Sequence, residues 1–132
     1  MVKKLLAIVE QGGYQNFTEL YKKCGFQVTM VHNMRKAMAI VRKEKPDIIV
    51  AEFNYQSDFR DRTSTLESLL ATVERIQAGV ENIQIRVIVF YEKEYAHQLE
   101  KLQSMFTNFD PVCYPIDAAA LESKICNAGI VG

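Results

Sequence analysis

The sequence predicts an α/β fold, a three-layer αβα sandwich built on a five-stranded parallel sheet. The first observation is that short apolar runs alternate five times with longer segments whose apolar residues recur at helical spacing. The second is that the runs at 5–9 and 48–51 are continuously apolar, which is typical of strands buried on both faces. The third is the length of 132 residues, so we expect residues 1–132 to form a single domain.

The strands are expected at 5–9, 26–31, 47–53, 85–91 and 111–116. The run FQVTMV at 26–31 alternates apolar and polar residues, which predicts a half-exposed strand at an edge of the sheet. Parallel strands joined through helices require right-handed crossovers, so few topologies remain. With the second strand at an edge, the sequence favours the flavodoxin-like order 2-1-3-4-5.

Helices are expected between the strands because apolar residues there recur every three or four positions. The expected helices lie within 16–25, 33–45, 64–79, 95–106 and 118–127. Gly25 is placed to end the first helix. Ser64 and Glu67 give the third helix a capping box. Asp117 caps the last helix.

The amino-acid composition limits the kinds of binding partner and the cellular compartment that we expect for this protein. The net charge is zero, so no overall field favours nucleic acid or a membrane surface. The apolar run at 5–9 is too short for a signal peptide or a membrane span. The three cysteines, Cys24, Cys113 and Cys126, form an odd set without a CxxC motif, which argues against a disulfide scaffold or a zinc site. We therefore expect a cytoplasmic protein.

One segment carries a family resemblance. RKEKPDIIVAEFN, residues 42–54, has a charged helix end, Pro-Asp, an apolar strand and an acid at the end of that strand. This pattern resembles the phospho-acceptor region of response-regulator receiver domains, the CheY-like family, and the resemblance extends over about residues 3–128. In that family the acid is the aspartate that accepts the phosphoryl group, and here the position holds Glu52.

The other positions of the receiver site are altered as well. The resemblance places the acid pair after the first strand on Glu10 and Gln11, so one acid is replaced. The hydroxyl position after the fourth strand holds Tyr91. The lysine of the family's Lys-Pro pair is replaced, giving Tyr114 and Pro115, and the resemblance implies a cis bond between these two residues.

These replacements predict a degenerate receiver domain, a pseudo-receiver. The lost lysine removes the cation that neutralises a phosphoryl group, and Glu52 carries its oxygens further out than an aspartate does. We expect no enzyme activity, no cofactor and no aspartyl-type phosphorylation. The expected role is binding of a signalling protein in a two-component or related bacterial pathway. The resemblance implies a contact surface over the fourth helix, fifth strand and fifth helix, residues 95–126, where a homodimer could also form.

Alternatives remain open at this point. Glu10 and Glu52 could hold a metal such as Mg²⁺ in an atypical phospho-accepting regulator, because hard cations prefer oxygen ligands. Glu52 could be an idle acid at a strand end or a fixed mimic of the phosphorylated state. A flavodoxin-like domain for a small ligand is a further alternative, although the sequence has neither a GxGxxG nor a GxxxxGK[ST] motif to cradle phosphates.

Overall fold

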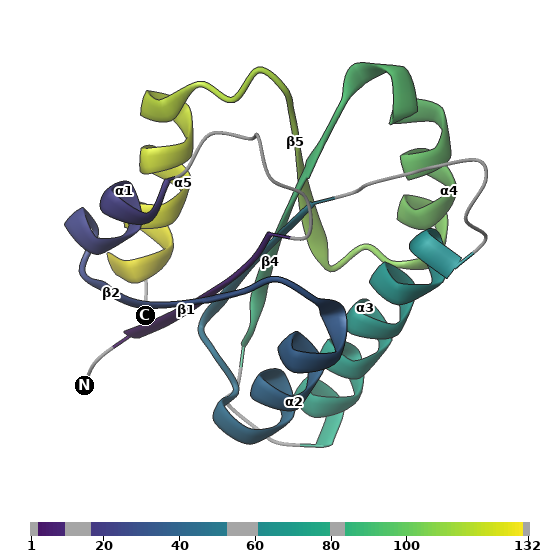
Figure 1. The fold of residues 1–132 in the computed structure, drawn as a ribbon, viewed down its shortest axis with the longest axis horizontal. Helices are drawn as coiled ribbons and strands as arrows, with labels where there is room; N and C mark the ends of the chain where they lie inside the picture. The colour runs from purple at the N-terminus through teal and green to yellow at the C-terminus, as the bar shows by residue number, and fades with distance from the viewer. Residues whose placement is uncertain (1–2, 10–16, 53–60, 80–83, 131–132) are drawn as a thin grey trace.

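The computed structural model describes residues 3–9, 17–52, 61–79 and 84–130. Five strands form one sheet in the order β2-β1-β3-β4-β5, and all four strand pairs are parallel (Figure 1). The fold class and the strand order predicted from the sequence are confirmed. The strands are β1 (Lys3–Ile8), β2 (Phe26–Val31), β3 (Ile48–Glu52), β4 (Arg86–Tyr91) and β5 (Phe109–Cys113).

The fifth strand differs most from its predicted range. It begins at Phe109 rather than at 111 and ends at Cys113 rather than at 116. Pro111 lies inside the strand, opposite Val89 of β4. Proline has no N–H to donate, and an edge strand tolerates it where the missing N–H would face away from the sheet. The position of β5 at the edge of the sheet explains the difference.

In the described residues, helical segments lie between the strands and after the last one: α1 (Thr18–Lys23), α2 (Met34–Glu44), α3 (Asp61–Gly79), the 3₁₀ turn η1 (Lys93–Tyr95), α4 (Ala96–Met105) and α5 (Ala118–Ile130). Gly25 follows α1 with a φ of 92°, and the Asp117 carboxylate accepts a hydrogen bond from the Ala119 N–H at 3.0 Å, as the sequence predicts. The prediction for Ser64 is wrong, because α3 already begins at Asp61 and Ser64 lies inside it.

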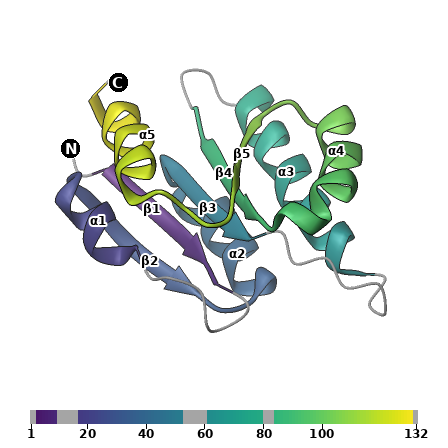
Figure 2. The same ribbon diagram turned by 90° about the horizontal axis from the view of Figure 1, so that it is seen from above.

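The helices divide between the two faces of the sheet. Helices α1 and α5 lie together on one face, and α2, α3 and α4 cover the other (Figures 1 and 2). Each face has its own core. The core under α2, α3 and α4, here called the aliphatic core, consists of buried Leu, Ile, Val, Ala and Met side chains such as Leu69 and Leu102. The core under α1 and α5, here called the aromatic core, contains Phe17, Tyr21, Phe26 and Phe90.

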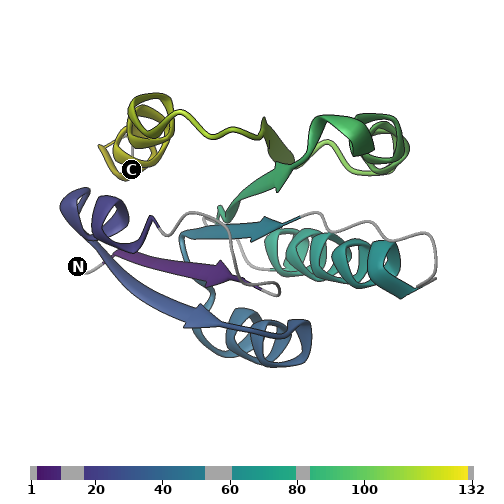
Figure 3. The same ribbon diagram turned by 45° about the horizontal axis from the view of Figure 1, so that its top comes forward.

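A disulfide joins the two helices of the aromatic face. Cys24, at the end of α1, is bonded to Cys126 in α5, and their Cα atoms are 5.0 Å apart. Figure 3 shows α1 and α5 side by side. The odd cysteine count argued against such a bond, and that argument is wrong for this pair. The two cysteines are separated by 102 positions, and only the packing of α5 against α1 brings them together. Cys113 on β5 is a free thiol.

A charged pair links β5 to the neighbouring strand β4. Arg86 of β4 donates from Nη2 to the Asp110 carboxylate at 2.7 Å and from Nη1 to the Lys124 carbonyl oxygen of α5 at 3.4 Å. Arg86 therefore links β4, β5 and α5. Among the residues described, no helix has the length and apolar character needed to cross a bilayer.

Candidate functional site

Glu52 is the last residue of β3, and its carboxylate is buried. Side chains alternate along a strand, so Glu52 shares a face with Ile48 and Val50, both members of the aromatic core. Only 8% of the residue is exposed. A strand-end acid that served only solubility would lie in water, so this burial sets Glu52 apart.

Tyr114 reaches Glu52 from the other side of β4. Its hydroxyl donates a hydrogen bond to Glu52 Oε2 at 3.3 Å. The tyrosine is held just after β5 by its own N–H, which donates to the Tyr91 carbonyl oxygen at 2.8 Å. The bond from Tyr114 to Pro115 is cis, as the receiver resemblance implies. Two positions that the sequence singled out, 52 and 114, are therefore in direct contact.

Aromatic rings line the approach to this carboxylate. Phe90 of β4 lies opposite Glu52 in the register of the two strands. The Phe90 ring meets the ring of Phe17 edge to face, with centroids 5.9 Å apart, and meets the ring of Tyr114 in the same way at 5.8 Å. Three aromatic side chains from three separate segments thus form one row beside Glu52.

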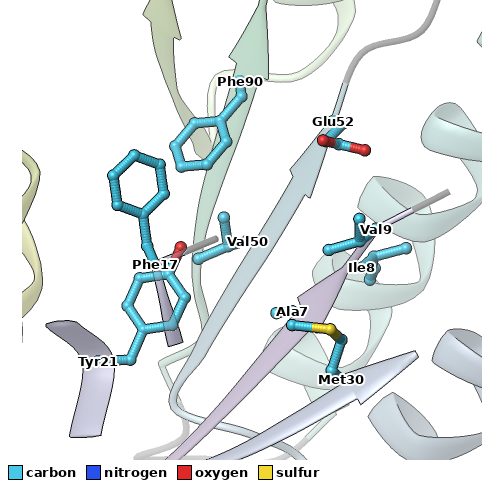
Figure 4. Close-up of a pocket in the computed structure, with 9 residues that line it drawn as sticks. All are labelled: Ala7, Ile8, Val9, Phe17, Tyr21, Met30, Val50, Glu52 and Phe90. Carbon is cyan, nitrogen blue, oxygen red and sulfur yellow. The ribbon is translucent and has the colours of Figure 1, made fainter. Parts of the chain in front are cut away.

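A pocket of about 90 Å³ opens at this end of the sheet (Figure 4). Phe17, Tyr21 and Phe90 form one side of it, and Glu52 lies across from them. Apolar side chains of β1, β2 and β3 and the residue after β1 complete the lining: Ala7, Ile8, Val9, Met30 and Val50. The pocket lies by the carboxyl ends of β1 and β3, where the chain order of the strands reverses and ligands of such folds bind.

Tyr21 contributes a buried hydroxyl to the pocket. The residue is 3% exposed. Burial, and secondly the negative charge of Glu52, raise the pKa of Tyr21 well above its ordinary value. The phenol therefore stays neutral over the physiological pH range, and its ring keeps the electron-rich face of an uncharged tyrosine.

Tyr91 lies at the end of β4 but packs on the other face. Its ring contacts the aliphatic core, whereas its neighbour Phe90 belongs to the aromatic core. Partial burial, followed by the electrostatic effect of nearby Cys113, raises the pKa of Tyr91. The structure thus groups Tyr114 with Glu52 and places the Tyr91 side chain against the aliphatic core.

The acids predicted after β1, Glu10 and Gln11, lie outside the described residues. Within the ranges that the structure describes, no three His, Cys, Asp or Glu side chains gather as a metal ion would require. Glu52 supplies the carboxylate of the pocket, and the remaining lining is apolar or phenolic. The described part of the site offers a hard divalent cation too few oxygens.

Sequence reasoning missed the partners of Glu52 inside the pocket. The spacing of apolar residues predicts that Phe17 and Tyr21 share the apolar face of the first helix and that Phe90 fills an apolar strand, and it links none of the three to Glu52. Alternation along the strands could have indicated this contact. Glu52 and Val50 are two positions apart and so point to the same face of the sheet. Phe90 lies opposite Glu52 on the neighbouring parallel strand. What the sequence did not show is which face α1 covers.

The structure resembles receiver domains of response regulators. A receiver domain from Clostridium thermocellum aligns with a TM-score of 0.70 at 16% identity, over 96% of this chain and 94% of that one. The chemotaxis protein CheY4 of Vibrio cholerae gives 0.66 at 16% identity, covering 97% and 99% of the two chains. A CheY-like receiver domain from Methylobacillus flagellatus gives 0.66 at 20% identity, with the same coverage. At these identities the likeness establishes the fold.

No protein-family model matches the sequence, and no curated protein matches it.

Proposed function

We propose that residues 1–132 act as one receiver-like module in two-component or related signalling, which binds another protein and does not accept a phosphoryl group at Glu52. The observation that carries the proposal is the state of Glu52. Its carboxylate is buried in a fold shared with receiver domains and accepts a hydrogen bond from Tyr114 at 3.3 Å. The proposal describes a binding module rather than an enzyme.

Phosphoryl transfer makes demands that this site meets poorly. The transferred group needs positive charge around its oxygens and an attacking oxygen in line with the leaving group. At the position where receivers carry a lysine, Tyr114 offers a neutral hydroxyl instead. Glu52 is 8% exposed, and Phe90 packs beside it, so a phosphoryl donor has little access to the carboxylate. We infer that Glu52 represents a fixed state rather than a switch.

The proposed contact surface lies over α4, β5 and α5, residues 95–126. β5 is an edge strand whose five residues are all half-buried, so its outer side is available for contact. On the neighbouring α4, Met105 is 55% exposed, an unusual placement for a large apolar side chain. A signalling protein or a second copy of the chain could cover this surface.

A cytoplasmic location fits a partner in bacterial signalling. The disulfide between Cys24 and Cys126 is the observation that opposes it, because disulfides persist mainly in oxidising compartments. Labelling of thiols in intact cells before lysis would show whether this bond exists where the protein works.

The phosphorylation half of the proposal has a direct test. The protein is incubated with Mg²⁺ and acetyl phosphate, and its intact mass is measured beside a receiver domain that retains its aspartate and lysine. We expect the control to gain a phosphoryl group and this protein to keep its mass. A gain in mass that disappears in Glu52→Gln would overturn the proposal and favour an atypical regulator that uses Glu10 and Glu52 with a metal.

A further inference from the structure

A strongly charged surface lies on α2, away from the pocket beside Glu52. It consists of four exposed cationic side chains, here called the cationic face: Arg35, Lys36, Arg42 and Lys43. We propose that the cationic face binds an acidic helix of a partner protein. The inference goes beyond the proposed function, whose contact surface over α4, β5 and α5 lies on other elements.

The spacing of the four cations places them on one side of the helix. An α-helix turns by about 100° per residue, so positions seven apart differ in direction by only about 20°. Arg35 is therefore aligned with Arg42, and Lys36 is aligned with Lys43 beside them. The cationic face thus has an amino-terminal pair and a carboxyl-terminal pair, about 10.5 Å apart along the helix axis. The opposite side of α2 is buried against the aliphatic core.

No acid among the described residues forms an ion pair with the cationic face. Glu44 is the acidic residue of α2, and its carboxylate instead lies 3.3 Å from Nζ of Lys4 on β1. The other ion pairs of the described residues involve none of the four cations. Positive charge therefore accumulates over about two turns of one helix.

Helix stability does not account for the amino-terminal pair. The first turn of a helix carries a partial positive charge and the last turn a partial negative charge, so cations are favourable only near the end. Arg42 and Lys43 lie in the last turn of α2, where they stabilise the helix. Arg35 and Lys36 lie in the first turn, which contains no acid. A role in binding would explain why this end of α2 is cationic.

A local acidic segment suits the cationic face better than an extended polyanion does. The chain has a net charge of zero, so a long nucleic acid would also meet the acids elsewhere on the surface. Helices that bind an anionic membrane insert large apolar side chains next to their cations. The apolar side of α2 is buried in the fold and is not available for insertion.

The shape of the surface favours a helix as the acidic segment. Ala39 is exposed between the two cation pairs, and its small side chain allows a partner backbone to approach closely. A partner helix with two pairs of acids seven positions apart would carry both pairs on one side, again about 10.5 Å apart. Each acid pair would then face one cation pair.

The test is a titration of the full chain with two designed peptides, followed by NMR at constant ionic strength. Both are alanine-rich helices with two pairs of glutamates. The pairs are seven positions apart in the first peptide and five apart in the second, where they point to different sides of the helix. We expect the first peptide to shift the methyl signal of Ala39 saturably, but not that of Ala120, which is exposed on α5.

The second peptide separates a matched helix from unspecific attraction between charges. It has the same composition but can engage only one cation pair at a time, so we expect about 5-fold weaker binding. A short DNA duplex and vesicles with anionic lipids are titrated in parallel. Equal affinity of the two peptides, no saturable shift at Ala39, or tighter binding of DNA or vesicles than of the first peptide would overturn the proposal.

Substitutions then separate binding from support of the fold. The double change Arg35→Glu and Lys36→Glu should weaken binding of the first peptide at least about 10-fold, because attraction becomes repulsion at two positions. Its urea denaturation midpoint should be unchanged or higher, since acids suit the first turn of a helix. Lys93→Glu with Lys101→Glu is the matched control, because it makes the same change of charge at exposed positions on η1 and α4.

The control variant should keep its affinity for the first peptide within about 2-fold. Unchanged affinity in the α2 variant, equal losses in both variants, or a lower midpoint in the α2 variant would each contradict the proposal. A failure of these tests leaves the phosphorylation result intact, because that result is read from the mass of the protein.

Discussion

The two faces of the sheet differ in their cores. Helices α2, α3 and α4 cover a core whose buried side chains are aliphatic or methionine. Helices α1 and α5 cover the core that contains the buried aromatic residues Phe17, Tyr21, Phe26 and Phe90. The aromatic face also carries the buried acid, the pocket and the disulfide. Flexible aliphatic side chains can interdigitate closely. Rigid rings meet edge to face in preferred geometries and carry an electron-rich face. The pocket beside Glu52 therefore has both apolar and polar lining, whereas the aliphatic core is closed by apolar side chains.

The largest expected effect concerns the disulfide of the aromatic face. Reduction, or replacement of Cys24 and Cys126 by serine, should lower the free energy of unfolding by about 2–4 kcal/mol, because the bond constrains a long segment of the unfolded chain. Urea denaturation with and without reductant measures the effect. Cys113→Ser is the control, since this half-buried thiol forms no disulfide, and it should leave the response to reductant unchanged. An unchanged denaturation midpoint after reduction would show that the aromatic face holds together without the bond.

The next prediction compares the same substitution on the two faces. Val89 lies in the aliphatic core and Val50 lines the pocket. Val89→Ala should cost about 2.5 kcal/mol in unfolding free energy, from lost burial and a new cavity. Val50→Ala should cost about 1 kcal/mol less, because its methyl groups already border empty space. Denaturation of both variants checks the difference, and equal costs would show that the pocket side is packed as tightly as the other.

A smaller effect should appear at alkaline pH. The pKa of Tyr21 is raised in the folded state above its ordinary value of 10.0. The stability that the neutral Tyr21 side chain gives the folded state is therefore fully present below pH 10. This stability is lost as the pH rises further, because Tyr21 in the unfolded chain loses its phenolic proton first. The loss should approach about 1.4 kcal/mol per pH unit. Stability of the wild type and of Tyr21→Phe is measured from neutral to alkaline pH. Tyr21→Phe should flatten the curve, and an unchanged curve would contradict the prediction.

The smallest effect concerns the contact between Tyr114 and Glu52. Tyr114→Phe removes a hydroxyl donor at 3.3 Å and should cost about 0.5–1 kcal/mol, near the low end for a hydrogen bond. Tyr91→Phe is the matched control at the neighbouring strand end, where the ring packs against the aliphatic core, and it should cost less than about 0.5 kcal/mol. A larger loss of unfolding free energy in Tyr91→Phe than in Tyr114→Phe would contradict the expected contribution of the hydrogen bond from Tyr114 to Glu52.

The fold was largely predictable because it depends on patterns local in sequence. Continuous apolar runs identified the central strands, and the alternation in β2 placed it at an edge. The predictions failed where tertiary position decided the outcome. Pro111 lies within β5 because that strand is also at an edge, and α3 begins before Ser64, at Asp61. Neither fact follows from spacing along the chain.

The receiver resemblance singled out Glu52 and Tyr114 but none of the aromatic walls of the pocket. The structure places the Tyr114 hydroxyl 3.3 Å from Glu52 Oε2, and their assignment to a receiver-like site stays a prediction. The pocket depends on Phe17 and Tyr21 lying over the same face as Glu52, which requires knowing where α1 packs. The disulfide depends likewise on α5 lying beside α1. Contacts between segments so distant in sequence leave no local signature.

The bond between Cys24 and Cys126 also changes how the chain responds to cutting. It closes a covalent ring with a sequence separation of 102 positions, so most of the polypeptide lies inside the ring. A protease that cleaves one peptide bond within the ring linearises it but releases no fragment. On a gel without reductant, such a nicked molecule keeps its full mass, and it separates into two pieces only after reduction.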